Sequence, residues 1–220
     1  MIIVQRLPFS RRSIAIGGRA FIVETVDDQD ALLAASGDRA IFPFGLMLWE
    51  AAAGLAVELS ECAPPIAGQS ILELGAGLGL SGVVAAALGA HVTQTDHDPT
   101  TLSACARTAE LNGVVGIRTR LGDWHGWCDD ARYDLIIGAD IAYDSADHEA
   151  LCVIFARNLK PAGRVLIADP GRENQALFLK RAVAQGWTVS RTHRRVADLK
   201  SKEPGAEITI AIIELTRAPA

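Results

Sequence analysis

The fold is decided by the stretch ILELGAGLGLSG, residues 71–82. Its first four residues are apolar apart from one glutamate and predict a buried strand. Glycines follow at Gly75, Gly77, Gly79 and Gly82. Because glycine has no Cβ, a strand can turn sharply into a helix at such residues, and the backbone can approach a ligand closely. The stretch therefore predicts a strand, a ligand-binding loop and a helix.

From residue 70 onward, short apolar runs alternate with helical patterns. The runs are ILEL, HVTQT, YDLIIGAD and RVLIAD, and the helical patterns after them are LSGVVAAALG, TTLSACARTAELNG, DHEALCVIFARNLK and ENQALFLKRAVAQG. Repeated strand–helix units predict a parallel sheet with helices on both faces. The last two β-like segments, WTVSRTHRRV and EITIAIIEL, have no helix between them and are expected to pair antiparallel. The predicted fold class is α/β, a Rossmann-like, doubly wound and mostly parallel seven-stranded sheet with a C-terminal antiparallel hairpin.

Ahead of this sheet, the sequence predicts a β-hairpin and a helix. SIAIGGRAFIVETV reads as two strands turning at Gly17 and Gly18, and Pro43 to Leu59 reads as a helix that leads into the sheet. We see no linker, repeat or low-complexity segment. We therefore expect one domain over residues 1–220, with an N-terminal extension at 1–69 and the sheet core at 70–220.

Composition limits the classes of partner. The chain has 220 residues, of which 50% are hydrophobic, which is enough for a sizeable buried core. Its formal charge of −5 disfavours nucleic acid as the main partner, because phosphate contacts need clustered Lys and Arg. The one basic run, RTHRRV at 191–196, is expected to be a solvated strand face.

Membrane and metal sites are not expected either. MIIVQRLPFSRR, at the N-terminus, lacks the order of a signal peptide, and the most apolar window contains Pro43, Glu50 and Glu58, as a buried helix would. We therefore expect a cytoplasmic protein. The histidines show no ligand spacing, and the cysteines form no CxxC pair, so we expect core thiols and no metal. The cysteines are Cys62, Cys105, Cys128 and Cys152.

Two classes of cofactor use a glycine turn of this kind. A dinucleotide site needs G-x-G-x-x-G directly after the strand, but the sixth residue counted from Gly75 is Leu80. Counted from Gly77 the pattern fits, yet that glycine lies two residues beyond the strand end. The remaining pattern, h-h-E-h-G-x-G-x-G, resembles motif I of the class I S-adenosylmethionine-dependent methyltransferases.

This resemblance implies a cofactor site. The methionine part of S-adenosylmethionine would lie along the glycine loop, and the acidic residue of the strand would take part in the site. The residues concerned are Glu73, Gly75, Ala76, Gly77 and Gly79.

Three more residues extend the implied site. Asp96 ends the next strand, where a carboxylate can accept hydrogen bonds from both ribose hydroxyls, although a dinucleotide site would use it in the same way. In RLGDWHG, the resemblance places Asp123 at the exocyclic amine of adenine and Trp124 over the ring. LKPAGRVLIAD is similar to the LKPGG turn of the same superfamily, so the resemblance spans about residues 70 to 170.

A narrower resemblance appears in two places. GADIAYD, with Asp140 and Tyr143, is similar to the D-x-x-Y motif of the seven-strand protein lysine methyltransferases. FGLMLWEAA is similar to their sequence before the core, where a tryptophan, here Trp49, lies near the methionine end of the cofactor. Enzymes that methylate an exocyclic base amine carry two prolines where this chain has Ile141 and Ala142, so a planar base is the less expected acceptor.

The position of Asp140 indicates a role. In an open α/β sheet the first and fourth strands lie side by side at the topological switch point, so Asp140 is expected beside the sulfonium. A lysine amine, with a pKa of about 10.4, is protonated at neutral pH and has no lone pair. We expect Asp140 to capture and orient the ammonium, Tyr143 to shape a narrow approach, and water to take the proton. The alternatives are a helix cap for Asp140 and a core ring for Tyr143.

The sequence therefore predicts an S-adenosylmethionine-dependent N-methyltransferase, monomeric, that acts on a lysine of a protein substrate. A small-molecule amine or carboxylate as the acceptor is the nearest alternative. A nicotinamide-dependent oxidoreductase and a nucleotide-binding module without catalysis are more distant ones.

Overall fold

A seven-stranded sheet forms the centre of the computed structural model, which describes residues 7–36, 43–63, 65–201 and 203–217. Its order is β5-β4-β3-β6-β7-β9-β8; β3 to β7 run parallel, and β9 runs antiparallel to both β7 and β8. The predicted fold class is confirmed. The strands are β3 (Ser70–Leu74), β4 (His91–Asp96), β5 (Arg118–Leu121), β6 (Tyr133–Ala139), β7 (Leu159–Asp169), β8 (Thr188–Ala197) and β9 (Glu207–Thr216).

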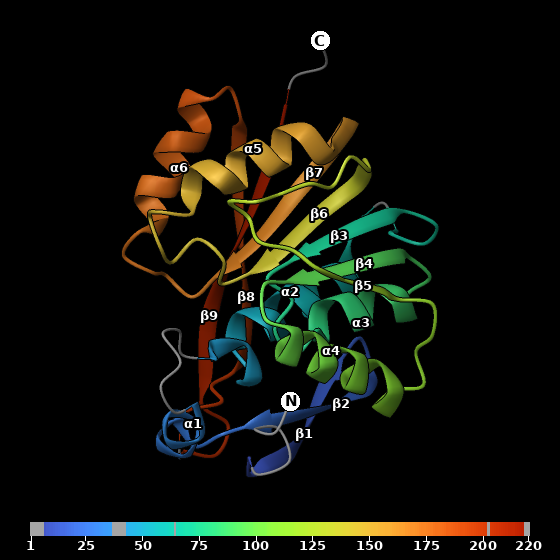
Figure 1. Ribbon diagram of the computed structural model, residues 1–220, viewed down its shortest axis with the longest axis vertical. Coiled ribbons are helices and arrows are strands. Elements are labelled where there is room, and N and C mark those ends of the chain that lie inside the picture. Colours follow the sequence, from blue (N-terminus) through green and yellow to red (C-terminus); the bar gives the residue numbers. More distant parts are fainter. Residues whose placement is uncertain (1–6, 37–42, 64, 202, 218–220) are drawn as a thin grey trace.

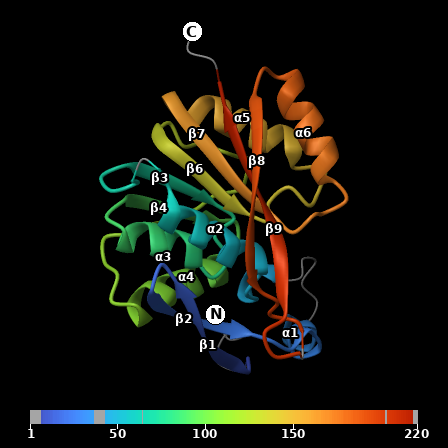
Figure 2. The ribbon, with the colours of Figure 1, turned by 180° about the vertical axis from the view of Figure 1, so that it is seen from behind.

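Helices cover both faces of the sheet (Figures 1 and 2). One face carries α2 (Glu50–Glu61), α3 (Leu80–Ala87) and α4 (Pro99–Leu111), and the other carries α5 (His148–Asn158) and α6 (Gln175–Ala184). Alternating residues of β3 show the two sides: Ile71 packs in the cluster around α2 and α3, and Leu72 packs with α5 and α6. Side chains that alternate along a strand thus fill two separate cores.

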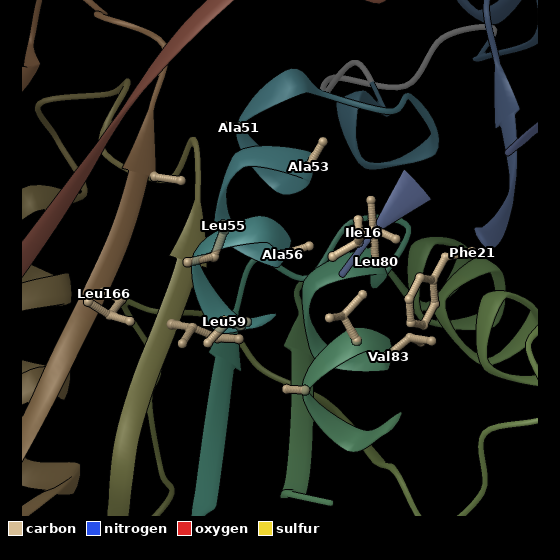
Figure 3. Packing of buried hydrophobic residues seen from close by; sticks show 14 of the residues in the cluster. Ile16, Phe21, Ala51, Ala53, Leu55, Ala56, Leu59, Leu80, Val83 and Leu166 are labelled. Carbon is tan, nitrogen blue, oxygen red and sulfur yellow. The ribbon is translucent and has the colours of Figure 1, made fainter. Parts of the chain in front are cut away.

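The predicted N-terminal hairpin is present as β1 (Phe9–Ile16) and β2 (Arg19–Val26), and both turn glycines have positive φ. Its apolar side belongs to the same core as the sheet, since Ile16 and Phe21 pack in one cluster with Leu80 and Val83 (Figure 3). Polar contacts add to this packing. Asn112, at the end of α4, accepts a hydrogen bond from the backbone N of Ile22 at 2.8 Å and donates one to its carbonyl at 2.7 Å.

The predicted helix from Pro43 to Leu59 is partly wrong. The chain forms a short 3-10 helix, η2 (Phe44–Leu46), and is extended at Met47 and Trp49, so α2 begins only at Glu50. The backbone N of Leu48 donates to Oγ1 of Thr25 at 2.9 Å, which fixes the extended segment against β2. A contact between residues far apart in sequence therefore overrides the local helical pattern.

Two further features differ from expectation. The sequence did not indicate α1 (Gln29–Ser36), which begins where the Asp28 carboxylate accepts hydrogen bonds from the backbone N of Asp30 and of Ala31. Cys105 and Cys152 are buried as expected, but Cys128 is exposed in the loop between β5 and β6. None of the helices described is long and apolar enough to cross a membrane.

Candidate active site

The carboxyl ends of the parallel strands meet at one edge of the sheet (Figure 1). The loop between β3 and α3 lies there, with Gly75, Gly77 and Gly79 at φ of 59°, 56° and 76°. These angles lie in the left-handed region that favours glycine. Ala76 continues the sheet, because its backbone N donates to the carbonyl of Thr95 at 2.9 Å.

The loop has a tight inner side. A Cβ on Gly79 would lie 2.4 Å from Sγ of Cys105, and one on Gly82 would lie 2.3 Å from Oε2 of Glu73. These two glycines are therefore required by packing. A Cβ on Gly77 would meet backbone atoms of Gly45 only at 3.5 Å, which is ordinary contact. Gly77 is therefore favoured by its positive φ rather than by packing.

Glu73 lies beneath the loop and is only 2% exposed. Its Oε2 accepts a hydrogen bond from Nε2 of Gln94 at 2.7 Å, and its Oε1 accepts one from the backbone N of Gly82 at 3.2 Å. Burial raises the pKa of Glu73 from its ordinary value of 4.5 to about 7. The carboxyl group thus contacts the inner side of the loop, and a direct contact with the cofactor stays a prediction.

Asp96 lies at the end of β4 and touches the loop directly. Its Oδ2 accepts from the backbone N of Gly77 at 3.1 Å, and its Oδ1 accepts from the backbone N of Asp98 at the same distance. Burial raises the pKa of this carboxyl, which is 5% exposed. The structure therefore brings Asp96 and the glycine loop together, as the ribose hypothesis requires.

The next two residues of the implied site differ in their surroundings. Trp124 lies over the loop, because its Cζ2 atom is 3.2 Å from the point where a Cβ on Gly75 would lie. Asp123 is exposed and accepts a hydrogen bond from the backbone N of His125 at 2.9 Å, which closes its own turn. Trp124 is thus placed to cover a ring held at the loop, and the adenine contact of Asp123 stays a prediction.

Asp140 follows β6 directly, and β6 pairs with β3 as the switch-point argument requires. Its backbone N donates to the carbonyl of Ala168 at 2.7 Å. Its φ of 55° is left-handed, and among the described non-glycine residues only Ala162 shares this feature. Such a conformation costs on the order of 1 kcal/mol and clusters at functional sites. The fold therefore holds Asp140 in a strained position.

Arg172, which the sequence analysis missed, pairs with Asp140. Its Nε donates to Oδ1 at 3.0 Å and its Nη2 donates to Oδ2 at 2.5 Å, and this pairing raises the pKa of Arg172. Arg172 follows β7, whose carboxyl end lies beside that of β6. Its position after a neighbouring strand was the signal that could have revealed it.

Tyr143 lies in the loop between β6 and α5, with 48% of the residue exposed. Partial burial raises the pKa of its hydroxyl. Two contacts fix the loop. Nε2 of His148, in α5, lies 2.9 Å from the carbonyl of Ala142, and Nδ2 of Asn174, the residue before α6, donates to the carbonyl of Tyr143 at 2.7 Å. The D-x-x-Y segment is therefore held at both its third and its fourth residue.

Trp49 lies beside Arg172. Its ring centroid is 5.5 Å from Cζ of Arg172 and 4.5 Å from Nζ of Lys200, and its Nε1 donates to the carbonyl of Phe44 at 3.0 Å. A cavity of about 300 Å³ adjoins this region, and Thr25, Met47, Leu48, Leu199 and Lys200 contribute to its lining. Trp49 therefore lies beside Arg172 and Lys200, and its contact with the cofactor stays a prediction.

These residues fit S-adenosylmethionine. The glycine loop turns with positive φ after β3, Asp96 places a carboxyl against the loop at the next strand end, and ring atoms of Trp124 lie beside Gly75. In the described part of the chain, no group of His, Cys, Asp and Glu side chains could hold a metal ion.

Comparison with known proteins identifies the family. A family model described as lysine methyltransferase matches residues 29–184. The chain is 32% identical over 112 residues to histone-arginine methyltransferase METTL23 of Xenopus laevis, covering 48% of each protein. It is 37% identical over 103 residues to protein N-lysine methyltransferase METTL21A of Danio rerio, covering 44% of this chain and 47% of that protein. The chain thus spans about half the length of these curated relatives.

Solved structures agree in fold. A putative RNA methyltransferase from Pyrococcus horikoshii has a TM-score of 0.59 at 19% identity, covering 76% of this chain and 83% of that one. The lysine methyltransferase model matches well over half of the sequence. The chain therefore belongs to the lysine methyltransferase family, and its cofactor is S-adenosylmethionine.

Proposed function

We propose that the protein transfers a methyl group from S-adenosylmethionine to the side-chain amine of a lysine in a protein substrate. One observation carries the proposal: at the edge of the sheet that holds the glycine loop, both carboxylate oxygens of Asp140 hold a cation, the guanidinium of Arg172. A carboxylate in this place can hold the ammonium of a lysine in the same way. The family and the name of the METTL21A relative support a lysine as the acceptor.

Some residues of the site would bind the cofactor, and others would bind the acceptor. When bound, S-adenosylmethionine supplies a methyl group that is already activated on a positively charged sulfur. Asp96 would hold the ribose and Trp124 would cover the adenine. Asp140 would bind the incoming ammonium, and Tyr143 would narrow the approach so that the nitrogen meets the methyl carbon in line.

The proton of the ammonium must leave before transfer. A carboxylate favours the charged form of an amine, whereas desolvation and a nearby positive charge favour the neutral form. We therefore assign Asp140 to capture and orientation and assign the proton to water. The amine lone pair would form the new N–C bond as the C–S bond breaks, and the electron pair of the C–S bond would stay on sulfur.

Labelled methyl transfer into a cell extract tests this function. We expect label from S-adenosylmethionine to appear in one or a few proteins, and mass spectrometry to find it on lysine. Asp140→Asn is the control and is expected to remove the label. Label found only in small molecules would contradict the proposal and support the alternative acceptor class.

An arginine acceptor is the second candidate, for a specific reason. Asp140 already accommodates a guanidinium through two hydrogen bonds, and the METTL23 relative is named a histone-arginine methyltransferase. The same mass spectra decide between methyl-lysine and methyl-arginine. The cytoplasmic location, the monomeric state and the lack of a nucleic-acid partner stay predictions.

A further inference from the structure

We propose that Arg172 occupies the position of the acceptor cation, so that an acceptor must displace it from Asp140 before methyl transfer. Arg172 would then determine specificity, because it admits only acceptors that can offset this displacement. The inference rests on the proposed function, since it takes Asp140 as the anchor of the acceptor.

The ion pair between Asp140 and Arg172 has the geometry of a bound substrate cation. Two parallel hydrogen bonds join the guanidinium to both carboxylate oxygens, so an incoming ammonium must compete with this cation for the same carboxylate. The Asp140 side chain is 8% exposed, whereas that of Arg172 is 39% exposed. The carboxylate is therefore the buried partner, and Arg172 covers it on the side from which solvent and an acceptor arrive.

The backbone of Arg172 is fixed while its side chain has another place to go. Oδ1 of Asp169 accepts hydrogen bonds from the backbone N of Gly171 at 2.7 Å and of Arg172 at 2.8 Å. The Trp49 ring already lies 5.5 Å from the guanidinium carbon, which is within the range of a cation–π contact. Because the Arg172 side chain is 39% exposed, its rotation alone can move the guanidinium off Asp140 toward solvent.

The carboxylates around Arg172 favour the binding of one more cation. The carboxylates of Glu50 and Asp169 also act on Arg172, together with Asp140. Oε1 of Glu50 and Oδ2 of Asp169 are buried and have no hydrogen-bond partner within the described residues. Lys200, with Nζ 3.9 Å from Oε2 of Glu50, is the second nearby cation. Among the described residues, these three carboxylates thus outnumber the two cations, so an incoming ammonium can be accepted while Arg172 stays close by.

Displacement links specificity to the size of the acceptor. A small amine gains only its contact with Asp140, and it must break a charge-assisted pair to do so. A lysine on a polypeptide also makes contacts far from the reacting nitrogen, and that binding energy can offset the loss of the pair. Arg172 is therefore expected to weaken the binding of small amines and to favour polypeptides.

A purely structural role for Arg172 predicts the opposite result. If Arg172 only holds the Asp140 side chain in place, its removal would disorder the carboxylate and weaken the binding of any ammonium. If Arg172 is a competitor, its removal frees the carboxylate and strengthens that binding. Whether removal of Arg172 weakens or strengthens ammonium binding therefore separates the two roles.

The test uses n-butylammonium as the probe, titrated by NMR into the full chain saturated with S-adenosylhomocysteine. We expect Arg172→Met to bind the probe at least about tenfold more tightly than the unmodified chain, and Arg172→Lys to fall between them. In an Asp140→Asn background, Arg172→Met should change nothing. Arg191→Met, on the exposed strand β8, is the matched control and should leave the affinity unchanged. Weaker or unaltered binding in Arg172→Met would overturn the inference.

A second measurement does not depend on a correctly folded Arg172→Met variant. The Nε–H resonance of Arg172, assigned by its absence from Arg172→Lys, should shift as the probe saturates the unmodified chain. An unmoved resonance at saturation would overturn the inference. The proposed function fails separately: methyl transfer to protein lysine would then be absent, whatever the probe affinity of Arg172→Met.

Discussion

Nε2 of Gln94 donates a hydrogen bond to Oε2 of Glu73 at 2.7 Å, and the two residues are direct neighbours on the parallel strands β4 and β3. The same Nε2 donates to the carbonyl of Gly79 at 2.9 Å. The pair therefore joins both strands to the glycine loop from below. Since Glu73 is buried, its protonation state should influence the stability of the whole loop region.

The first prediction concerns pH. The folded-state pKa of Glu73, about 7, lies above its ordinary value of 4.5, so the folded protein keeps a proton that the unfolded chain has lost. The free energy of unfolding should therefore fall as pH rises from 4.5 to 7, by about 3 kcal/mol from this group. Glu73→Gln should lack that part of the decrease.

Urea unfolding of both proteins at pH 5, 6, 7 and 8 measures this difference. Asp96, whose pKa burial also raises, is present in both proteins, so the difference between the curves isolates Glu73. Parallel curves would show that Glu73 is ionised in the folded protein throughout this range.

The second prediction concerns the ribose. Asp96→Ala should weaken the binding of S-adenosylhomocysteine by roughly 1.5 to 3 kcal/mol, because charged-acceptor hydrogen bonds to the hydroxyls are lost. Calorimetry measures the affinity. Asp98→Ala is the matched control: it removes the cap that accepts from the backbone N of Thr100 at 2.7 Å, so it should cost about 1 kcal/mol of stability and leave affinity intact. Equal affinities in all three proteins would remove the ribose assignment.

The third prediction concerns Trp49. Its ring lies beside two cations and its Nε1 donates to Phe44, yet the residue is only partly buried. Trp49→Ala should therefore weaken cofactor binding more than it lowers the melting temperature. Trp49→Phe keeps an aromatic face and should lose less affinity. A large fall in melting temperature with normal binding would make Trp49 an ordinary packing residue.

Much of this fold follows from local sequence. Strands such as β3 and β6 were predictable because their apolar runs end at Gly75 and Asp140, where turn-forming residues mark the strand ends. The segment at 43–49 was not, since the deciding hydrogen bond joins Leu48 to Thr25, 23 residues away. The local sequence pattern gives no information about a contact between residues so far apart.

The candidate site could likewise be predicted only where its residues belong to a local motif. The glycine loop and Asp96 could be located because the loop directly follows β3 and Asp96 ends β4. Arg172 could not be paired with Asp140 from a motif, because the two are 32 residues apart and meet only through the order of β6 and β7 in the sheet. Side-chain pairing between loops depends on topology, which sequence spacing does not contain.

The last prediction concerns the acceptor. Asp140→Asn keeps the shape of the side chain but removes its charge. We expect cofactor affinity to change little and methyl transfer to a protein lysine to fall about a hundredfold or more, because a charge-assisted contact worth on the order of 3 kcal/mol is lost and the nucleophile is misplaced. Tyr143→Phe should cost less, since the ring stays and only the hydroxyl goes.

Cofactor affinity and single-turnover methyl transfer, measured on the same variant, give the decision. Near-normal transfer by Asp140→Asn would contradict a lysine ammonium at Asp140 and favour a neutral or small acceptor. Loss of both binding and transfer would assign Asp140 to the cofactor loop, to which the strand pair β3 and β6 connects it. Loss of transfer alone is the outcome that the bidentate contact with Arg172 leads us to expect, because it shows a carboxylate already built to hold a cation.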